Sequence, residues 1–162
     1  MMKWFLVFVV AMVLGSCGTT VYQLHTTCDK GNEELFQSLT TVLLSSNFLV
    51  KQNDPKNGYL QAETMPEFNF WLGMQEQRIW TFQLIDSIPK SSAGNDGAKV
   101  MKKLISSAKV VYVKQNAFGS TVAGNTVYYN DETHKDWTWY WDIRNRIQQM
   151  CSDIRIIEKK VN

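Results

Sequence analysis

The order of its hydrophobic patterns is the feature that most constrains the fold of this chain. Several short runs in which apolar and polar residues alternate lie between two helical patterns, at residues 32–47 and 136–152. Helical periodicity places apolar residues along one stripe of a helix, whereas alternation is typical of a strand with one buried face. Strands gathered between two helices favour an α+β fold over repeated βαβ units. We therefore predict an antiparallel sheet of about five or six strands with two main helices packed on one face.

Turn residues mark the ends of the expected elements. A hairpin is predicted around Asp54-Pro55 and Asn57-Gly58, because these pairs favour tight turns. Asn47 is predicted to end the first helix in the left-handed conformation. Residues 87–98, rich in Ser, Gly, Asn and Asp, are predicted to form a loop, and residues 100–108 a short helix. The expected strands are residues 21–27, 48–52, 59–64, 78–85, 110–114, 126–129 and 154–159.

The N-terminus has the three-part pattern of a secretory signal. Lys3 supplies a positive charge, residues 4–14 are apolar without interruption, and Gly15 and Ser16 precede Cys17. A membrane-spanning helix needs about 20 apolar residues, roughly twice the length of this run. Residues 1–16 are therefore predicted to be a cleaved signal peptide rather than a membrane span.

The four residues Leu14-Gly15-Ser16-Cys17 resemble the lipobox of bacterial lipoproteins, although Ala or Ser is commoner than Gly at position 15. The resemblance implies cleavage before Cys17, diacylglycerol on its thiol and a further acyl chain, such as palmitate, on its amino group. Gly18 stands where Asp would imply retention in the inner membrane of many Gram-negative bacteria, so outer-membrane sorting is implied. Two or more acyl chains anchor a protein stably. Residues 17–20 would then be a short lipid tether, and residues 21–162 a single domain of ordinary size.

Two cysteines remain, Cys28 and Cys151. In an oxidising compartment they could form a disulfide that closes a loop of almost the whole domain. They could equally be two separate buried thiols, because free cysteine is among the most buried residue types. The sequence leaves both alternatives open.

Charge argues against a nucleic-acid partner, because 17 basic side chains are nearly balanced by 15 acidic ones. Residues 97–130 nevertheless contain no acid and five lysines, at positions 99, 102, 103, 109 and 114. Such a segment on a membrane-tethered domain could contact anionic lipid head groups. A solvated face is the commoner explanation for a run of this kind.

The segment 136–141 has the most unusual composition, with three tryptophans and a tyrosine. On a helical wheel, Trp137 and Trp141 lie together with Arg144 and Gln148, opposite the expected core stripe. Tryptophan and arginine are frequent at the centres of protein interfaces, and indole rings also stack on sugars, so these four residues are predicted to form a partner or ligand face. The alternatives are packing beneath a loop or strand, or a strand instead of a helix. The core stripe comprises Trp139, Ile143, Ile147, Met150 and Ile154, with Tyr140 and Cys151 at its edge.

A second apolar segment spans residues 66–74. Phe68, Phe70, Leu72 and Met74 alternate, which favours a half-buried strand. The alternative is an exposed apolar rim that contacts lipid or a partner.

Motifs of catalysis are absent from the sequence: it contains no G-x-S-x-G, HExxH, CxxC or phosphate-binding glycine loop. His25 and His134 are far apart and have no Cys or carboxylate at ligand spacing, so no metal and no cofactor are predicted. Asp86 and Asp131 could approach one another only through folding. The sequence therefore predicts a non-enzymatic envelope lipoprotein with a binding or assembly role, as an accessory subunit of an envelope complex. Glycan or small-ligand binding is the alternative, and an unrecognised hydrolase is a third hypothesis.

Overall fold

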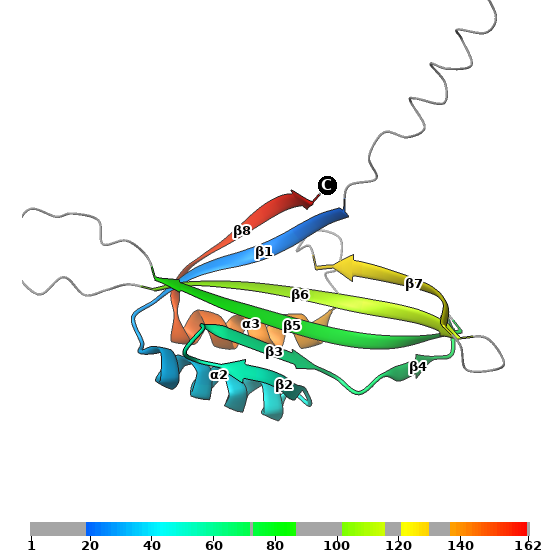
Figure 1. Cartoon of the computed structure of the whole chain (residues 1–162), viewed down its shortest axis with the longest axis horizontal. Helices are drawn as coiled ribbons and strands as arrows, with labels where there is room; N and C mark the ends of the chain where they lie inside the picture. The colour runs from blue at the N-terminus through cyan, green and yellow to red at the C-terminus, as the bar shows by residue number, and fades with distance from the viewer. Residues whose placement is uncertain (1–18, 72, 87–101, 116–120, 130–136, 162) are drawn as a thin grey trace, which may run out of the picture.

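The computed structural model describes residues 19–71, 73–86, 102–115, 121–129 and 137–161 (Figure 1). They form one antiparallel sheet of eight strands together with two helices, which confirms the α+β class and raises the number of strands above the predicted five or six. The helices are α2 (Asn32–Ser45) and α3 (Thr138–Met150). The strands are β1 (Thr19–Cys28), β2 (Leu49–Asp54), β3 (Tyr59–Glu63), β4 (Glu67–Asn69), β5 (Met74–Asp86), β6 (Lys102–Gln115), β7 (Thr121–Tyr128) and β8 (Ser152–Val161).

Several of the predictions concern residues outside the described ranges. These are the signal peptide 1–16, the lipidation site Cys17, the loop 87–98, Lys99, Asp131 and His134.

The strands are ordered β2-β3-β5-β6-β1-β8, with β4 added beside β5 and β7 beside β6. The long central pair, β5 and β6, is bonded from Gln75 opposite Val113 to Asp86 opposite Lys102. The first strand lies between β6 and the last strand, and Thr19 pairs with Val161. The two ends of the described chain therefore lie side by side (Figure 1).

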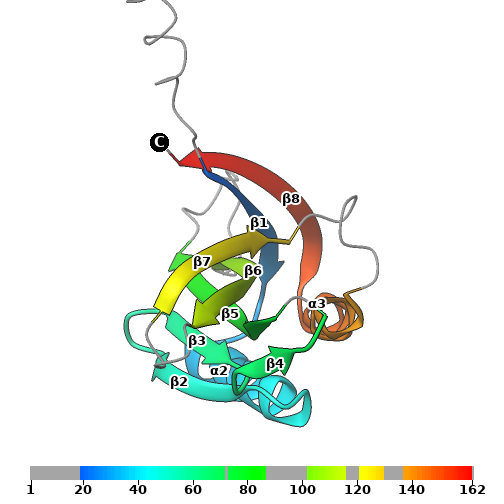
Figure 2. The same ribbon diagram turned by 90° about the vertical axis from the view of Figure 1, so that its right-hand side faces the viewer.

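Both helices cover the same face of the sheet, on the inner side of its curve (Figure 2). Where the helices cover β1, β5 and β6, alternate residues on the covered face of these strands are buried, and the buried residues of α2 and α3 belong to the same cluster. Burying one such Leu, Ile or Phe side chain stabilises the fold by about 1.5–3 kcal/mol. Neither of these two helices is long and apolar enough to cross a membrane. The buried cluster includes Leu24, Leu60, Trp80, Phe82, Leu104 and Ala108 from the strands, Leu35, Phe36, Leu39 and Leu43 from α2, and Tyr140, Ile143 and Ile147 from α3.

The structure joins Cys28 to Cys151 in a disulfide, with the two α-carbons 4.5 Å apart. Of the two alternatives left by the sequence, the bonded pair is therefore the one observed. The bond links the end of β1 to the residue that follows α3, across 123 positions of sequence. A loop of this length corresponds to about 4–5 kcal/mol of stabilisation in the chain-entropy description.

The helix predicted at residues 100–108 is wrong, because residues 102–115 form β6. Leu104, Ser106, Ala108 and Val110 face the core, whereas Ile105 on the opposite face is only partly buried. Apolar residues on both faces of a strand can imitate helical spacing over a short window.

The first strand begins at Thr19 rather than at Val21, since Thr19 and Thr20 pair with Val161 and Lys160 of β8. Half of the predicted tether 17–20 is therefore part of the sheet. Only Gly18 separates Cys17 from β1.

Candidate functional site

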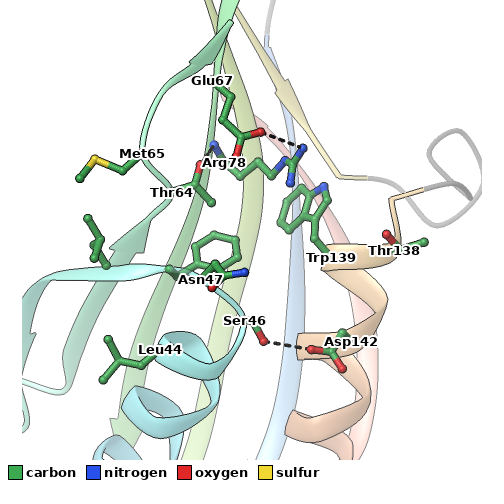
Figure 3. A pocket seen from close by; sticks show the side chains of 12 residues that line it. Leu44, Ser46, Asn47, Thr64, Met65, Glu67, Arg78, Thr138, Trp139 and Asp142 are labelled. Carbon is green, nitrogen blue, oxygen red and sulfur yellow. Dashed lines mark hydrogen bonds and ion pairs between the residues drawn. The ribbon is translucent and has the colours of Figure 1, made fainter. Parts of the chain in front are cut away.

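A cleft of about 730 Å³ opens where α2 ends and α3 begins (Figure 3). The sheet continues beyond the ends of both helices, so its inner face is uncovered there. The wall nearest α2 comes from the helix end and the start of β2, and the opposite wall from the first turns of α3. The lining residues are Leu44, Ser46, Asn47, Phe48, Leu49, Thr64, Met65, Glu67, Arg78, Thr138, Trp139 and Asp142.

Asn47 shapes the α2 side of the cleft. Its φ of 62° is left-handed, a conformation that Asn adopts more readily than most residues, and it turns the chain from α2 into β2. The predicted helix stop at Asn47 is therefore confirmed. The turn also buries Phe48, whose backbone N–H donates to the carbonyl of Leu43 over 2.9 Å.

Aromatic rings form the floor of the cleft. The rings of Phe48 and Trp139 are 5.9 Å apart between centroids, and Trp80 meets Trp139 edge-on at 6.2 Å. Trp80 is completely buried, whereas Trp139 is half-buried and lines the cleft. Trp139, predicted in the core stripe, packs against the core from this half-buried position, whereas Tyr140, predicted at the edge of the stripe, is only 1% exposed and belongs to the core.

Arg78 provides the positive charge of the cleft. Its guanidinium lies 5.9 Å from the centre of the Trp139 ring, 3.1 Å from a carboxylate oxygen of Glu76 and 3.9 Å from one of Glu67 (Figure 3). The Glu67 side chain is 70% exposed, so its pair with Arg78 is open to solvent and contributes little stability. Burial, followed by the negative charge of Glu76, raises the pKa of the nearby Tyr112 above its usual value.

Polar contacts hold the ends of the two helices together on the other side. The Ser46 hydroxyl donates to a carboxylate oxygen of Asp142 over 2.9 Å. Arg146 bonds the other oxygen of Asp142 over 3.2 Å and donates to the Ser45 hydroxyl over 3.3 Å. These contacts are exposed and individually weak, but together they fix the separation of the cleft walls.

Sequence reasoning missed this cleft, although β5 carries a signal for it. Trp80, Phe82 and Leu84 point toward the core, and Arg78 occupies the next position of the same face. The alternation predicts an apolar residue at position 78, but the residue there is charged. This indicates that the core ends before Arg78 and that the strand continues into a polar site.

The structure places the four residues of the predicted partner or ligand face, Trp137, Trp141, Arg144 and Gln148, close together beside the core. Arg144 lies 4.9 Å above the Trp141 ring, and its guanidinium is 3.5 Å from the side-chain oxygen of Gln148. Trp137 and Trp141 are half-buried and contact the Tyr129 ring, with centroids 5.7 and 6.1 Å away. Both indoles therefore pack on the protein itself along part of their surface. The sequence did not indicate Tyr129 as their partner, because no local pattern shows how the chain turns between β7 and α3.

The most exposed aromatic side chains of the described residues lie on what we call the aromatic hairpin, which consists of β4 and the turn that leads to β5. The exposed fractions are 65% for Phe68, 81% for Phe70 and 94% for Trp71. Gly73 completes the turn with a φ of 61°. The favoured prediction of a half-buried strand over residues 66–74 is therefore wrong: β4 ends at Asn69, and the alternative of an exposed apolar rim describes this segment.

A smaller hollow of about 310 Å³ lies on the sheet near His25, Lys103, Asp153 and Arg155. Burial, and then the charge of Lys103, lowers the pKa of His25 below its ordinary value. His25 lies in the first strand, as predicted.

Within the described ranges, no group of three or more His, Cys, Asp or Glu side chains is arranged to hold a metal ion. Comparisons with protein-family models, with curated proteins and with solved structures find no match to this chain. The candidate site therefore stands on its own geometry: an open cleft with an aromatic floor and one charged wall, beside an exposed aromatic hairpin.

Proposed function

We propose that this chain is a lipid-anchored accessory subunit of the bacterial envelope that binds a segment of a partner protein in the cleft and performs no chemistry on it. The observation that carries the proposal is the open cleft at the helix ends with its exposed apolar rim. Outer-membrane placement and the lipid on Cys17 come from the lipobox-like sequence at residues 14–17.

The rim of the cleft supports protein binding. Leu44, Leu49 and Met65 line it and are 54%, 40% and 68% exposed. A partner that covered one such side chain completely would gain about 1.5–3 kcal/mol, less the part already buried. Met65 is also adaptable, because its unbranched side chain can follow the shape of a partner.

The polar groups of the cleft favour a partner segment that pairs an apolar side chain with an acidic one. Arg78 is held tightly by Glu76 but only loosely by Glu67, at 3.1 and 3.9 Å. A carboxylate of the partner can therefore replace Glu67 beside Arg78, while the apolar side chain contacts Phe48 and Trp139. A few polar groups that fix orientation within an apolar site are typical of binding pockets.

Photo-crosslinking in intact cells tests this proposal. A photo-reactive amino acid at Met65 should capture a discrete partner, and the same group at Gln149, an exposed residue farther along α3, should not. The Arg78→Ala change should reduce capture from position 65 about tenfold, because a charge-assisted hydrogen bond contributes about 1.5–3 kcal/mol. Equal capture from positions 65 and 149 would contradict binding in the cleft. Capture from position 65 that is unchanged by Arg78→Ala would contradict it as well.

Glycan binding is the second candidate, and the half-buried indole of Trp139 favours it. Trp139 lies beside Asp142, Asn47 and Glu67, which together offer an aromatic face and several hydrogen-bonding groups. Soluble cell-wall fragments should then quench tryptophan fluorescence in a saturable way, and Trp139→Phe should reduce that response. A panel of sugars that leaves the fluorescence of the wild-type protein unchanged would rule this candidate out.

The anchor is tested separately by metabolic labelling with a fatty-acid analogue. The label should enter the wild-type chain and be lost with Cys17→Ala. Label that persists in the Cys17→Ala chain would contradict the proposed lipidation site.

A further inference from the structure

We infer that the aromatic hairpin inserts into the surface of the bilayer, as a second membrane contact beside the lipid. This inference rests on the lipid anchor of the proposed function, but it concerns a different surface from the cleft. It assigns a role to Phe68, Phe70 and Trp71, the three aromatic side chains that pack least on the rest of the described chain.

The chemistry of the hairpin is that of a membrane interface. Tryptophan is enriched at the level of the lipid head groups, where its ring is both apolar and polar, and phenylalanine is common on the apolar faces of interfacial segments. Trp71 and Phe70 are 94% and 81% exposed, and they occupy a turn rather than a broad flat face. A turn of this kind can enter the boundary between head groups and acyl chains without burying any of the sheet.

The position of the hairpin matches that of the anchor. β1 starts in the right-hand half of the molecule in Figure 1, and the turn between β4 and β5 lies in the same half, farther to the right. Cys17 is two residues before Thr19, so even an extended chain holds it within about 7 Å of the first residue of β1. The lipid would therefore keep the half of the sheet that carries the hairpin near the bilayer.

The charges near the hairpin are compatible with a lipid surface. Gln75, at the base of the hairpin, pairs with Val113, so the exposed Lys114 is next to this base. A lysine near an anionic membrane contributes about 1 kcal/mol to binding. Glu67 and Glu76 share the single positive charge of Arg78, at 3.9 and 3.1 Å, so that together with Lys114 the charges of this region balance.

A bilayer also accounts for the exposure better than an occasional protein partner does. Exposed apolar side chains on a protein that diffuses freely promote association. On an anchored protein the bilayer is always within reach, because tethering makes the second contact intramolecular. Three weakly packed aromatic side chains are then sufficient to orient the domain.

Depth-dependent quenching tests the inference on the full lipidated chain, reconstituted in vesicles of phosphatidylethanolamine and phosphatidylglycerol. Phospholipids brominated near the head group should quench tryptophan fluorescence more strongly than those brominated near the chain end. Trp71→Phe should remove most of this quenching. Trp141→Phe is the matched control and should leave it unchanged, because Trp141 is half-buried against Tyr129.

The outcomes separate this inference from the proposed anchor. Quenching that is the same in the wild-type and Trp71→Phe chains would overturn membrane insertion, even if the fatty-acid label is present on Cys17. Loss of quenching with Trp71→Phe would support insertion, even if Cys17 carries no label. A blue-shifted Trp71 emission without quenching by brominated lipid would also overturn the inference, in favour of contact with a second copy of the chain.

Discussion

The two ends of the sheet differ in the exposure of their apolar side chains. At the end where β1 finishes, Cys28 is fully buried and bonded to Cys151, and Gly58 is buried in the turn between β2 and β3. At the other end, the aromatic hairpin leaves Trp71 94% exposed. At the first end, which we call the closed end, a disulfide and close packing bury the side chains. At the second end, apolar side chains are exposed and available for contact. Stability and binding are thus assigned to different parts of one sheet.

Two glycines show this difference at the level of single atoms. Gly58 and Gly73 both have a left-handed φ, of 64° and 61°. A Cβ added at Gly58 would lie 2.7 Å from the carbonyl oxygen of Leu84, whereas one added at Gly73 would meet no atom within 4 Å. Gly58 is therefore required for both conformation and space, and Gly73 for conformation alone.

Removal of the disulfide should have the largest effect on stability. The double change Cys28→Ser and Cys151→Ser should lower the free energy of unfolding by about 2–5 kcal/mol, because the unfolded chain regains the freedom of a very long loop. Urea unfolding of the oxidised wild type and of the double variant measures this difference. A change below about 1 kcal/mol would show that the closed end does not depend on its cross-link.

The glycine pair gives the next largest effects and compares the two ends directly. Gly58→Ala should cost about 2–4 kcal/mol, because backbone strain adds to a clash with the backbone of Leu84. Gly73→Ala should cost only about 1–2 kcal/mol, from the left-handed conformation. The same unfolding assay tests both variants, and equal losses would contradict the assignment of close packing to one end.

The pH dependence of stability should carry a smaller contribution from His25, on the side of the closed end. Its pKa is lowered in the folded protein, so the unfolded chain takes up a proton more readily as the pH falls through about 6.5. Stability should therefore be lower at pH 5.5 than at pH 7.5, and the loss is fully present below the folded pKa. His25→Gln should reduce this difference, and thermal unfolding at the two pH values checks it. An unchanged difference would mean that other groups cause it.

Polar substitutions in the aromatic hairpin should have the smallest effect on folding. Phe70→Ser and Trp71→Ser should change the free energy of unfolding by less than about 0.5 kcal/mol, because both side chains are almost fully exposed. Flotation of the Cys17→Ala chain, expressed without residues 1–16, with anionic vesicles should nevertheless decrease in both variants. A large loss of stability would show that these rings pack in solution.

The elements that can be predicted from the sequence are those with a strong local pattern. The helical spacing of Leu35, Phe36, Leu39, Val42 and Leu43 predicts α2; four of these residues are buried, and Val42 is half-buried against them. The turn around Asn57-Gly58 and the left-handed Asn47 were also predictable, because few residues adopt those conformations. These features depend on neighbours in the chain.

Features that depend on distant residues were not predictable. Residues 100–108 resembled a helix because β6 carries apolar residues on both faces, which depends on its strand neighbours β1 and β5. The cleft exists because α2 ends and α3 begins at the same level of the sheet. No local sequence pattern indicates that these two helix ends lie side by side. The exposure of Phe70 and Trp71 was equally hidden, since composition cannot tell whether a neighbouring element covers them.

The most direct test of the contrast between the two ends is labelling of single cysteines in native membranes. Trp71→Cys places a thiol on the aromatic hairpin, and Lys56→Cys places one in the exposed turn at the opposite end. A membrane-impermeant maleimide should label position 56 equally before and after detergent is added. It should label position 71 only after detergent, because the bilayer shields the hairpin. Equal labelling of position 71 in membranes and in detergent would contradict a membrane-facing end.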